Sequence, residues 1–236
     1  MVKEQELTEL VDRLKSAAGD NLCAVVLYGS AAKQESHTEF SDLNLMCILS
    51  ELSPARMAAL TSALRWWTAK GHAAPLFFSR QEVANAADVF SIEMLDIKQR
   101  HRILFGEDLF ATLHISMERH RIQLEHELRT KLLFLRQHYL LNSDDDSKIV
   151  GLMLEAVPNF ASLFRHVLIA MGEEPPAHKL QITERLGQKL GFDARPFVAL
   201  LQVRERKLKP SDIDAKRTFS GLILGIETVI HAVDAL

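Results

Sequence analysis

The sequence is poor in cysteine and lacks the signals of export and membrane insertion. Only Cys23 and Cys47 occur among its 236 residues, without CxxC spacing, which excludes a disulfide framework and a cysteine zinc site. Each lies in an apolar run, where we expect a small buried side chain on a strand. The charged N-terminus has no apolar signal-peptide core, and no apolar run reaches the roughly 18 residues of a membrane span. We therefore expect a cytoplasmic protein with no membrane partner.

The chain also lacks an excess of charge of one sign. It has 28 Lys and Arg against 31 Asp and Glu, a net charge of -3. Without a global basic field, a general DNA or RNA binder is disfavoured, although a small nucleotide needs only a local site. The apolar content of 47% is ordinary for a globular protein that buries a core.

Strand patterns are missing from the second half of the chain. Before residue 113, strands are predicted at 22–30, 43–49, 74–79, 89–97 and 101–110, and helices at 3–18, 53–71 and 80–87. After residue 112 the apolar spacing is helical, as in the leucines 124, 128, 132 and 135 of one long helix. We predict two domains, a domain with both helices and strands over residues 1–112 and an all-helical bundle over 113–236.

The stretch "VVLYGSAAKQESHTEFSDLNLMCIL" combines two apolar runs with a Gly-Ser turn. Gly29 permits an unusual backbone conformation and close approach by a ligand, and Ser30 begins a predicted helix whose free N–H groups favour a phosphate. Lys33 adds positive charge one turn later. Asp42 and Asn44 lie two apart on the next strand and so share one face. Paired carboxylates in this arrangement hold Mg²⁺ beside a triphosphate.

Gly29-Ser30, the polar connection and Asp42-Leu43-Asn44-Leu45 together resemble the nucleotidyltransferase fold of the DNA-polymerase-beta superfamily. "GSAAK" is similar to the Gly-Ser-x-Ala-Arg opening of its small bacterial members. "FSIEMLDI" and "HRILFGED" resemble the strand with the third acid and the region that follows it, which matches Glu93 to the third carboxylate. The helical remainder is similar in architecture to the bundle of kanamycin-type nucleotidyltransferases. The resemblance implies an α+β protein with a nucleotidyltransferase-type mixed sheet and helices, followed by an all-α bundle.

The resemblance also implies a reaction and a set of residue roles. An active member binds ATP or another nucleoside triphosphate with Mg²⁺ and transfers the nucleoside monophosphate to a hydroxyl acceptor. Gly29, Ser30 and Lys33 would then bind the nucleotide. Asp42, Asn44 and Glu93 would hold the metal, and Asp42 and Glu93 would be catalytic. Asp96 lies on the same expected strand and is an alternative third acid.

Asn44 departs from the family pattern, which has a second acid at this position. An amide offers one neutral carbonyl oxygen and is a poorer Mg²⁺ ligand than a carboxylate. We therefore expect nucleotide binding with transfer weakened or lost. The alternative is a non-enzymatic nucleotide sensor or scaffold whose bundle mediates oligomer or partner contacts. The long amphipathic helices make a homodimer a candidate state, although packing within the chain explains them equally.

Overall fold

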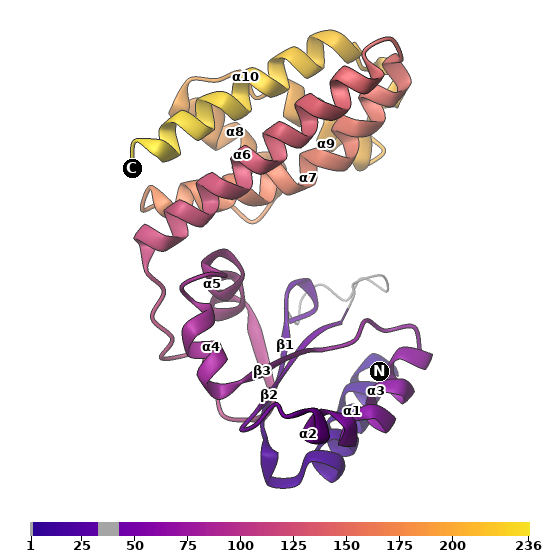
Figure 1. Ribbon diagram of the computed structural model, residues 1–236. Helices are drawn as coiled ribbons and strands as arrows, with labels where there is room; N and C mark the ends of the chain where they lie inside the picture. Colours follow the sequence, from indigo (N-terminus) through magenta and orange to yellow (C-terminus); the bar gives the residue numbers. More distant parts are fainter. Residues whose placement is uncertain (1, 33–42) are drawn as a thin grey trace. The chain divides into compact units, whose positions relative to one another are not determined.

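The computed structural model describes residues 2–32 and 43–236. The chain divides into two compact units, Met1–Ser116 (unit 1) and Met117–Leu236 (unit 2) (Figure 1). Unit 1 combines helices with a sheet. Unit 2 is helical throughout, as the missing strand patterns predict.

Four strands of unit 1 form one mixed sheet in the order β3-β2-β1-β4. The strands are β1 (Leu22–Tyr28), β2 (Asn44–Leu49), β3 (Leu76–Ser79) and β4 (His101–Gly106). β1 pairs antiparallel with both β2 and β4, whereas β2 and β3 are parallel. The central strands β1 and β2 are buried on both faces, which explains their nearly continuous apolar runs.

Helices cover both faces of this sheet (Figure 1). One face packs against α1 (Val2–Ala18) and α3 (Thr61–Ala69) through Leu10, Leu14 and Trp67. The other packs against α4 (Arg80–Ala86) and α5 (Ser91–Gln99) through Val83 and Met94. α4 begins with a capping box, in which the Glu82 N–H donates to Ser79 Oγ over 3.1 Å and Glu82 Oε2 accepts from the Ser79 N–H.

Two predictions for unit 1 are corrected by the structure. The pattern of residues 89–97 predicts a strand, but residues 91–97 lie in helix α5 (Ser91–Gln99). Phe90, Ile92 and Met94 alternate in the sequence, which fits the period 2 of a strand. The burial of Met94 and Ile97 beside the sheet instead follows helical spacing. The predicted helix over 53–71 is also divided, because α2 (Pro54–Ala59) ends where the Leu60 N–H bonds to the carbonyl oxygens of Ala58 and Met57.

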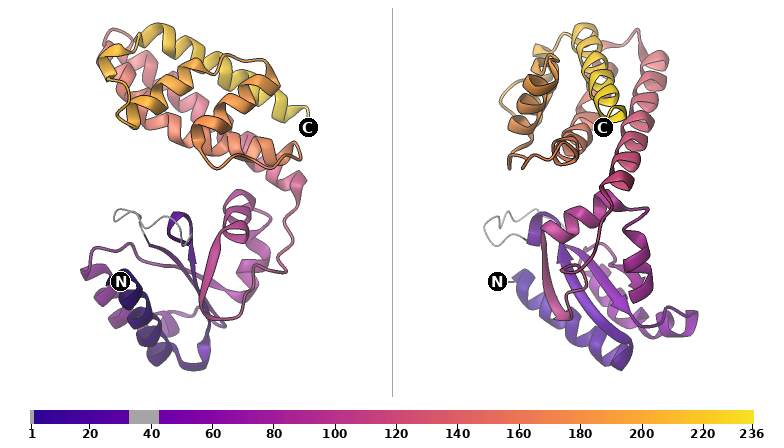
Figure 2. Two further views of the ribbon diagram at one scale, coloured as in Figure 1. Left: turned by 180° about the vertical axis from the view of Figure 1, so that it is seen from behind. Right: turned by 90° about the vertical axis from the view of Figure 1, so that its left-hand side faces the viewer.

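Unit 2 is a bundle of five helices, with α7 in contact with each of the others. They are α6 (Met117–Asn142), α7 (Asp146–Ala170), α8 (Lys179–Leu190), α9 (Arg195–Arg204) and α10 (Ala215–Asp234). Figure 2 shows α6 along one side of this bundle. The four predicted leucines of α6 are all buried, so their spacing marked the correct face.

Pro158 lies inside α7 without ending the helix. A proline has no N–H for the carbonyl oxygen four residues earlier, which belongs to Leu154. Arg204 Nη1 of α9 donates to this Leu154 oxygen over 2.9 Å. The tertiary contact thus satisfies the acceptor that the proline leaves open.

α7 is long and apolar enough, by length and composition alone, to cross a membrane. More than half of its most apolar stretch is buried within the protein. Its buried residues include Phe160, Phe164 and Leu168, which pack in the bundle. This burial is what the core helix of a folded bundle requires.

The two cysteines differ in accessibility. Cys47 is fully buried, as predicted, and burial raises the pKa of its thiol to about 12. Cys23 is only half-buried, with Sγ 3.1 Å from Ser50 Oγ. Because the thiolate is the reacting species, we expect a disulfide reagent at pH 8 to label one thiol in the native protein and two after unfolding. Cys23→Ser should remove the native reaction, whereas labelling of native Cys47 would contradict this assignment.

Candidate functional site

Gly29 forms a tight turn at the end of β1. Its φ is +80°, in the left-handed region that favours glycine. A Cβ at this position would stand 3.2 Å from the amide nitrogen of Asn44. Asn44 pairs with Tyr28 where β1 and β2 meet, so the Asn44 side chain lies beside the glycine turn. The sequence motif therefore brings Gly29 and Asn44 together.

A cavity of about 490 Å³ opens beside this turn. Its walls come from the ends of three strands and from α5. They are lined by Tyr28, Gly29, Met46, Leu76, Phe78, Phe90, Glu93, Met94, Asp96 and Ile97. Most of the wall is apolar, and the charged groups in it are the carboxylates of Glu93 and Asp96.

Both carboxylates reach the cavity from a helix rather than from a strand. Glu93 and Asp96 are three residues apart on α5, so they occupy neighbouring positions on one helix face. The prediction that Glu93 lies on a strand is therefore wrong. On β3, the strand parallel to β2, the cavity positions are occupied by Leu76 and Phe78. The third carboxylate was expected on a neighbouring strand, but the two carboxylates that line this cavity lie on a helix.

Three polar contacts anchor α5 and its continuation. His101 Nδ1 donates to the carbonyl oxygen of Ile97 over 2.8 Å, while its Nε2 lies 3.1 Å from Asp108 Oδ1. Lys98 Nζ donates to the Leu113 carbonyl oxygen over 2.7 Å. These contacts hold the C-terminal end of α5 against β4 and the following loop, and so fix the helix that carries Glu93 and Asp96.

Tyr28 was not predicted as a site residue, although it directly precedes Gly29. Its side chain is half-buried in the cavity wall, and burial raises the pKa of its hydroxyl above the ordinary value. The hydroxyl therefore stays protonated at neutral pH and can donate a hydrogen bond. The position next to a Gly-Ser turn was the available signal, but an aromatic residue at a strand end is more often read as core.

The other predicted residues are described only in part. Ser30 begins the short 3-10 helix η2 (Ser30–Ala32), directly after Gly29. Lys33 and Asp42 lie outside the described residues. Within residues 2–32 and 43–236, no group of three His, Cys, Asp or Glu side chains is placed to hold a metal ion. The metal role of Asp42, Asn44 and Glu93 therefore stays a prediction.

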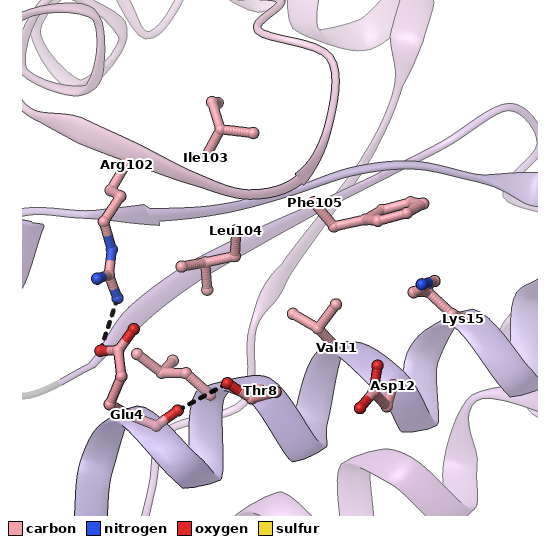
Figure 3. A pocket seen from close by; sticks show the side chains of 10 residues that line it. Glu4, Thr8, Val11, Asp12, Lys15, Arg102, Ile103, Leu104 and Phe105 are labelled. Carbon is pink, nitrogen blue, oxygen red and sulfur yellow. Dashed lines mark hydrogen bonds and ion pairs between the residues drawn. The ribbon is translucent and has the colours of Figure 1, made fainter. Parts of the chain in front are cut away.

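A second cavity, of about 390 Å³, lies between α1 and β4 (Figure 3). Arg102 of β4 donates to Glu4 of α1 over 3.0 Å, and Lys15 Nζ lies 5.1 Å from the centre of the Phe105 ring. None of the predicted site residues lines this cavity. The ion pair ties the first helix to the edge strand, a structural role.

Comparisons with known proteins find similarity in structure but not in sequence. No family model and no curated protein matches the chain. The solved structure of the spectinomycin adenyltransferase AAD(9) from Enterococcus faecialis, with ATP and spectinomycin, aligns with 96% of this chain and 98% of its own. The TM-score is 0.54 at 14% identity. This chain has a nucleotidyltransferase fold.

A second solved structure, the toxin-antitoxin MntA-HpeT mutant, aligns with 44% of this chain and 80% of its own. Its TM-score is 0.29 at 15% identity, too low to add to the assignment. The fold predicted from Gly29-Ser30 and the following strand is confirmed by the first comparison: an α+β nucleotidyltransferase-type sheet followed by a helical bundle.

Proposed function

We propose that this nucleotidyltransferase-fold protein binds a nucleoside triphosphate, ATP or another, in the cavity beside Gly29. Transfer of the nucleoside monophosphate to a hydroxyl acceptor is then weakened by Asn44. The observation that carries the proposal is the turn at Gly29, which has a positive φ and lines a cavity of about 490 Å³. A backbone turn free of side chain lets phosphates approach closely. That the similar AAD(9) structure contains ATP supports a nucleotide as the ligand.

The cavity lining supports a division of roles within the site. Apolar side chains of Met46, Phe78 and Met94 would pack against a base or another flat part of the ligand. The protonated Tyr28 hydroxyl would donate to an oxygen acceptor. Glu93 or Asp96 would accept the proton of the attacking hydroxyl, which requires a carboxylate within hydrogen-bond reach.

The described residues do not by themselves fit a full Mg²⁺ site. Asn44 offers one neutral oxygen, and no three suitable side chains cluster within the described part of the chain. We therefore derive no step through a metal and treat a Mg²⁺ requirement as a prediction to be measured. The apolar Leu76 and Phe78 on β3 favour the second candidate, a nucleotide sensor or scaffold without transfer.

The test measures thermal unfolding with ATP, with and without Mg²⁺, in the native protein, Asn44→Asp and Gly29→Ala. A ligand that binds only the folded state raises stability by about 1.4 kcal/mol at ten times its dissociation constant. We expect ATP to stabilise the native protein and Asn44→Asp to add a Mg²⁺-dependent increment. Gly29→Ala should lose the ATP effect, because its Cβ occupies the turn beside Asn44. Gly71→Ala is the matched control, with φ of +88° and open space around the Cβ.

Pyrophosphate release from ATP, with and without spectinomycin as a trial acceptor, measures transfer. Absence of an ATP effect in both the native protein and Asn44→Asp would favour the scaffold. An ATP effect confined to Asn44→Asp with Mg²⁺ would identify a site that no longer works. Rapid Mg²⁺-dependent transfer by the native protein would refute the weakening by Asn44. Where transfer is measurable, Glu93→Gln and Asp96→Asn separate the two candidates for the third acid, because the variant that loses transfer identifies it.

A further inference from the structure

His101 has an oxygen acceptor at each of its two ring nitrogens. Nδ1 lies 2.8 Å from the carbonyl oxygen of Ile97, and Nε2 lies 3.1 Å from Asp108 Oδ1. The same Asp108 oxygen accepts the backbone N–H groups of Phe110 and Ala111 over 3.0 and 3.1 Å. A carbonyl oxygen and an ionised carboxylate have no proton to donate. A neutral imidazole donates from one nitrogen only, so the imidazolium is the form that satisfies both contacts.

The ring of His101 joins the wall of the cavity beside Gly29 to the loop after β4. Ile97 lies on the last turn of α5 and lines this cavity, as does Met94 one turn earlier. His101 begins β4 at the register position opposite Tyr28, which also lines the cavity. Because the side chain of His101 is only 13% exposed, the ring is largely shielded from water, which strengthens its hydrogen bonds.

The elements around the ring carry further charged and titratable groups. They are Tyr28 on β1, Asp88 before α5, Glu93, Asp96 and Lys98 on α5, Arg100 and Arg102 beside His101, and Glu107 beside Asp108. Lys98 donates to the carbonyl oxygen of Leu113, and Arg102 donates to Glu4. In this set, the imidazole is the group that ordinarily changes its charge between pH 5 and 8.

We propose that His101 is a positioning residue for the nucleotide cavity, whose charged ring is a pH-sensitive clamp on α5. The inference rests on the proposed function, because the clamped helix forms one wall of the site assigned to the nucleotide. At pH 6 the imidazolium donates to both Ile97 and Asp108, which ties the end of α5 to the loop after β4. Above neutral pH the ring gives up one proton and keeps one of the two bonds. The wall is then held less firmly, so the affinity for nucleotide falls as the pH rises.

Nitrogen NMR of the histidine rings reads the charge of His101 directly, whether or not nucleotide binds. At pH 6 both ring nitrogens should carry a hydrogen, and at pH 8.5 one of them should have lost it. The methyl group of Met94, which is 2% exposed in the cavity wall, reports the position of α5. Its signal, assigned by its absence in Met94→Leu, should move between pH 6 and 8.5 in the native protein and stay in place in His101→Gln. His114→Gln replaces an exposed histidine of unit 1 and, as the matched control, should keep the native response.

The affinity for ATP shows whether the clamp acts on the site. ATP changes its own charge in this pH range, so the native protein is compared with His101→Gln at each pH. We expect the native protein to bind ATP about fivefold more tightly than His101→Gln at pH 6 and equally well at pH 8.5. Asp108→Asn keeps an oxygen for the two backbone N–H groups but removes the charge that favours the imidazolium. In this second variant the change in the Met94 signal should therefore occur at lower pH.

Three results would overturn the inference. The first is a neutral His101 ring at pH 6. The second is a Met94 signal that does not respond to pH, or that responds equally in the native protein and His101→Gln. The third is ATP binding whose ratio between these two proteins is the same at both pH values. Failure of the proposed function looks different: neither protein binds ATP at any pH, while the ring charge and the Met94 response are as expected, which would sustain the clamp and refute the nucleotide assignment.

Discussion

Gly106→Ala is expected to lower the free energy of unfolding of unit 1 by about 3 kcal/mol. The added Cβ is strained at a positive φ, and it also clashes with the backbone of a neighbouring strand. Gly106 ends β4 opposite Ala24, with φ of +81°. A Cβ there would stand 1.9 Å from the carbonyl oxygen of Cys23 and 3.0 Å from the Cα of Ala24. These are backbone atoms of the central strand, so relief requires a shift of the β1–β4 pairing.

Gly71→Ala separates the two causes. Gly71 also has a positive φ, +88°, but nothing lies within 4 Å of a Cβ built on it. In Gly71→Ala only the strain of the positive φ remains, which should lower the free energy of unfolding by about 1 kcal/mol. Both tryptophans, Trp66 and Trp67, lie on α3 of unit 1. Urea unfolding followed by tryptophan fluorescence therefore reports this unit. Equal losses of stability in the two variants would show that the contact with Cys23 is relieved at no cost.

Phe197→Ala is expected to lower the free energy of unfolding of unit 2 by about 4 kcal/mol, because it removes a fully buried ring from the bundle. The ring of Phe197 lies 5.2 Å from that of Phe164 and 5.7 Å from that of Phe192. It also packs on Gly225 of α10, where a Cβ would stand 2.7 Å from a ring carbon. Truncation leaves a cavity between helices that cannot all move inward. Urea unfolding followed by helical circular dichroism measures the loss.

A double-mutant cycle with Gly225→Ala tests this packing. In the native background, Gly225→Ala should destabilise the bundle, because its Cβ meets the Phe197 ring. In the Phe197→Ala background the same methyl group partly fills the vacated space, so its cost should fall or reverse. Strictly additive effects would mean that the two positions do not share this contact. Phe197→Leu, which keeps more of the volume, should cost less than half as much as Phe197→Ala.

Local patterns along the chain were sufficient to predict most of the elements. The leucines of α6 repeat at helical spacing and are buried, and the runs that became β1 and β2 are continuously apolar because helices cover both faces. Residues 89–97 were misassigned for a physical reason. Their apolar positions fit both period 2 and period 3.6, and only packing of Met94 and Ile97 on the sheet selects the helix.

The candidate site was predictable where a backbone requirement appears directly in the sequence. A glycine followed by Ser30 between two apolar runs indicates a turn, and Gly29 has the positive φ that such a turn uses. The position of Asn44 beside it follows from strand pairing. Glu93 and Asp96 meet this turn only because α5 folds over the open end of the sheet, which no local pattern indicates.

The sequence by itself determined the order and type of most elements, the nucleotidyltransferase fold through its Gly-Ser motif, and the Asn at position 44. The elements depend on periodicity and on backbone preferences, which neighbouring residues specify, whereas the fold was expected from the resemblance of the Gly-Ser motif to a known family. Tertiary structure alone decided that the cavity acids come from a helix and that Tyr28 and apolar β3 side chains line the cavity. Those properties depend on which segments, distant in the chain, pack against each other.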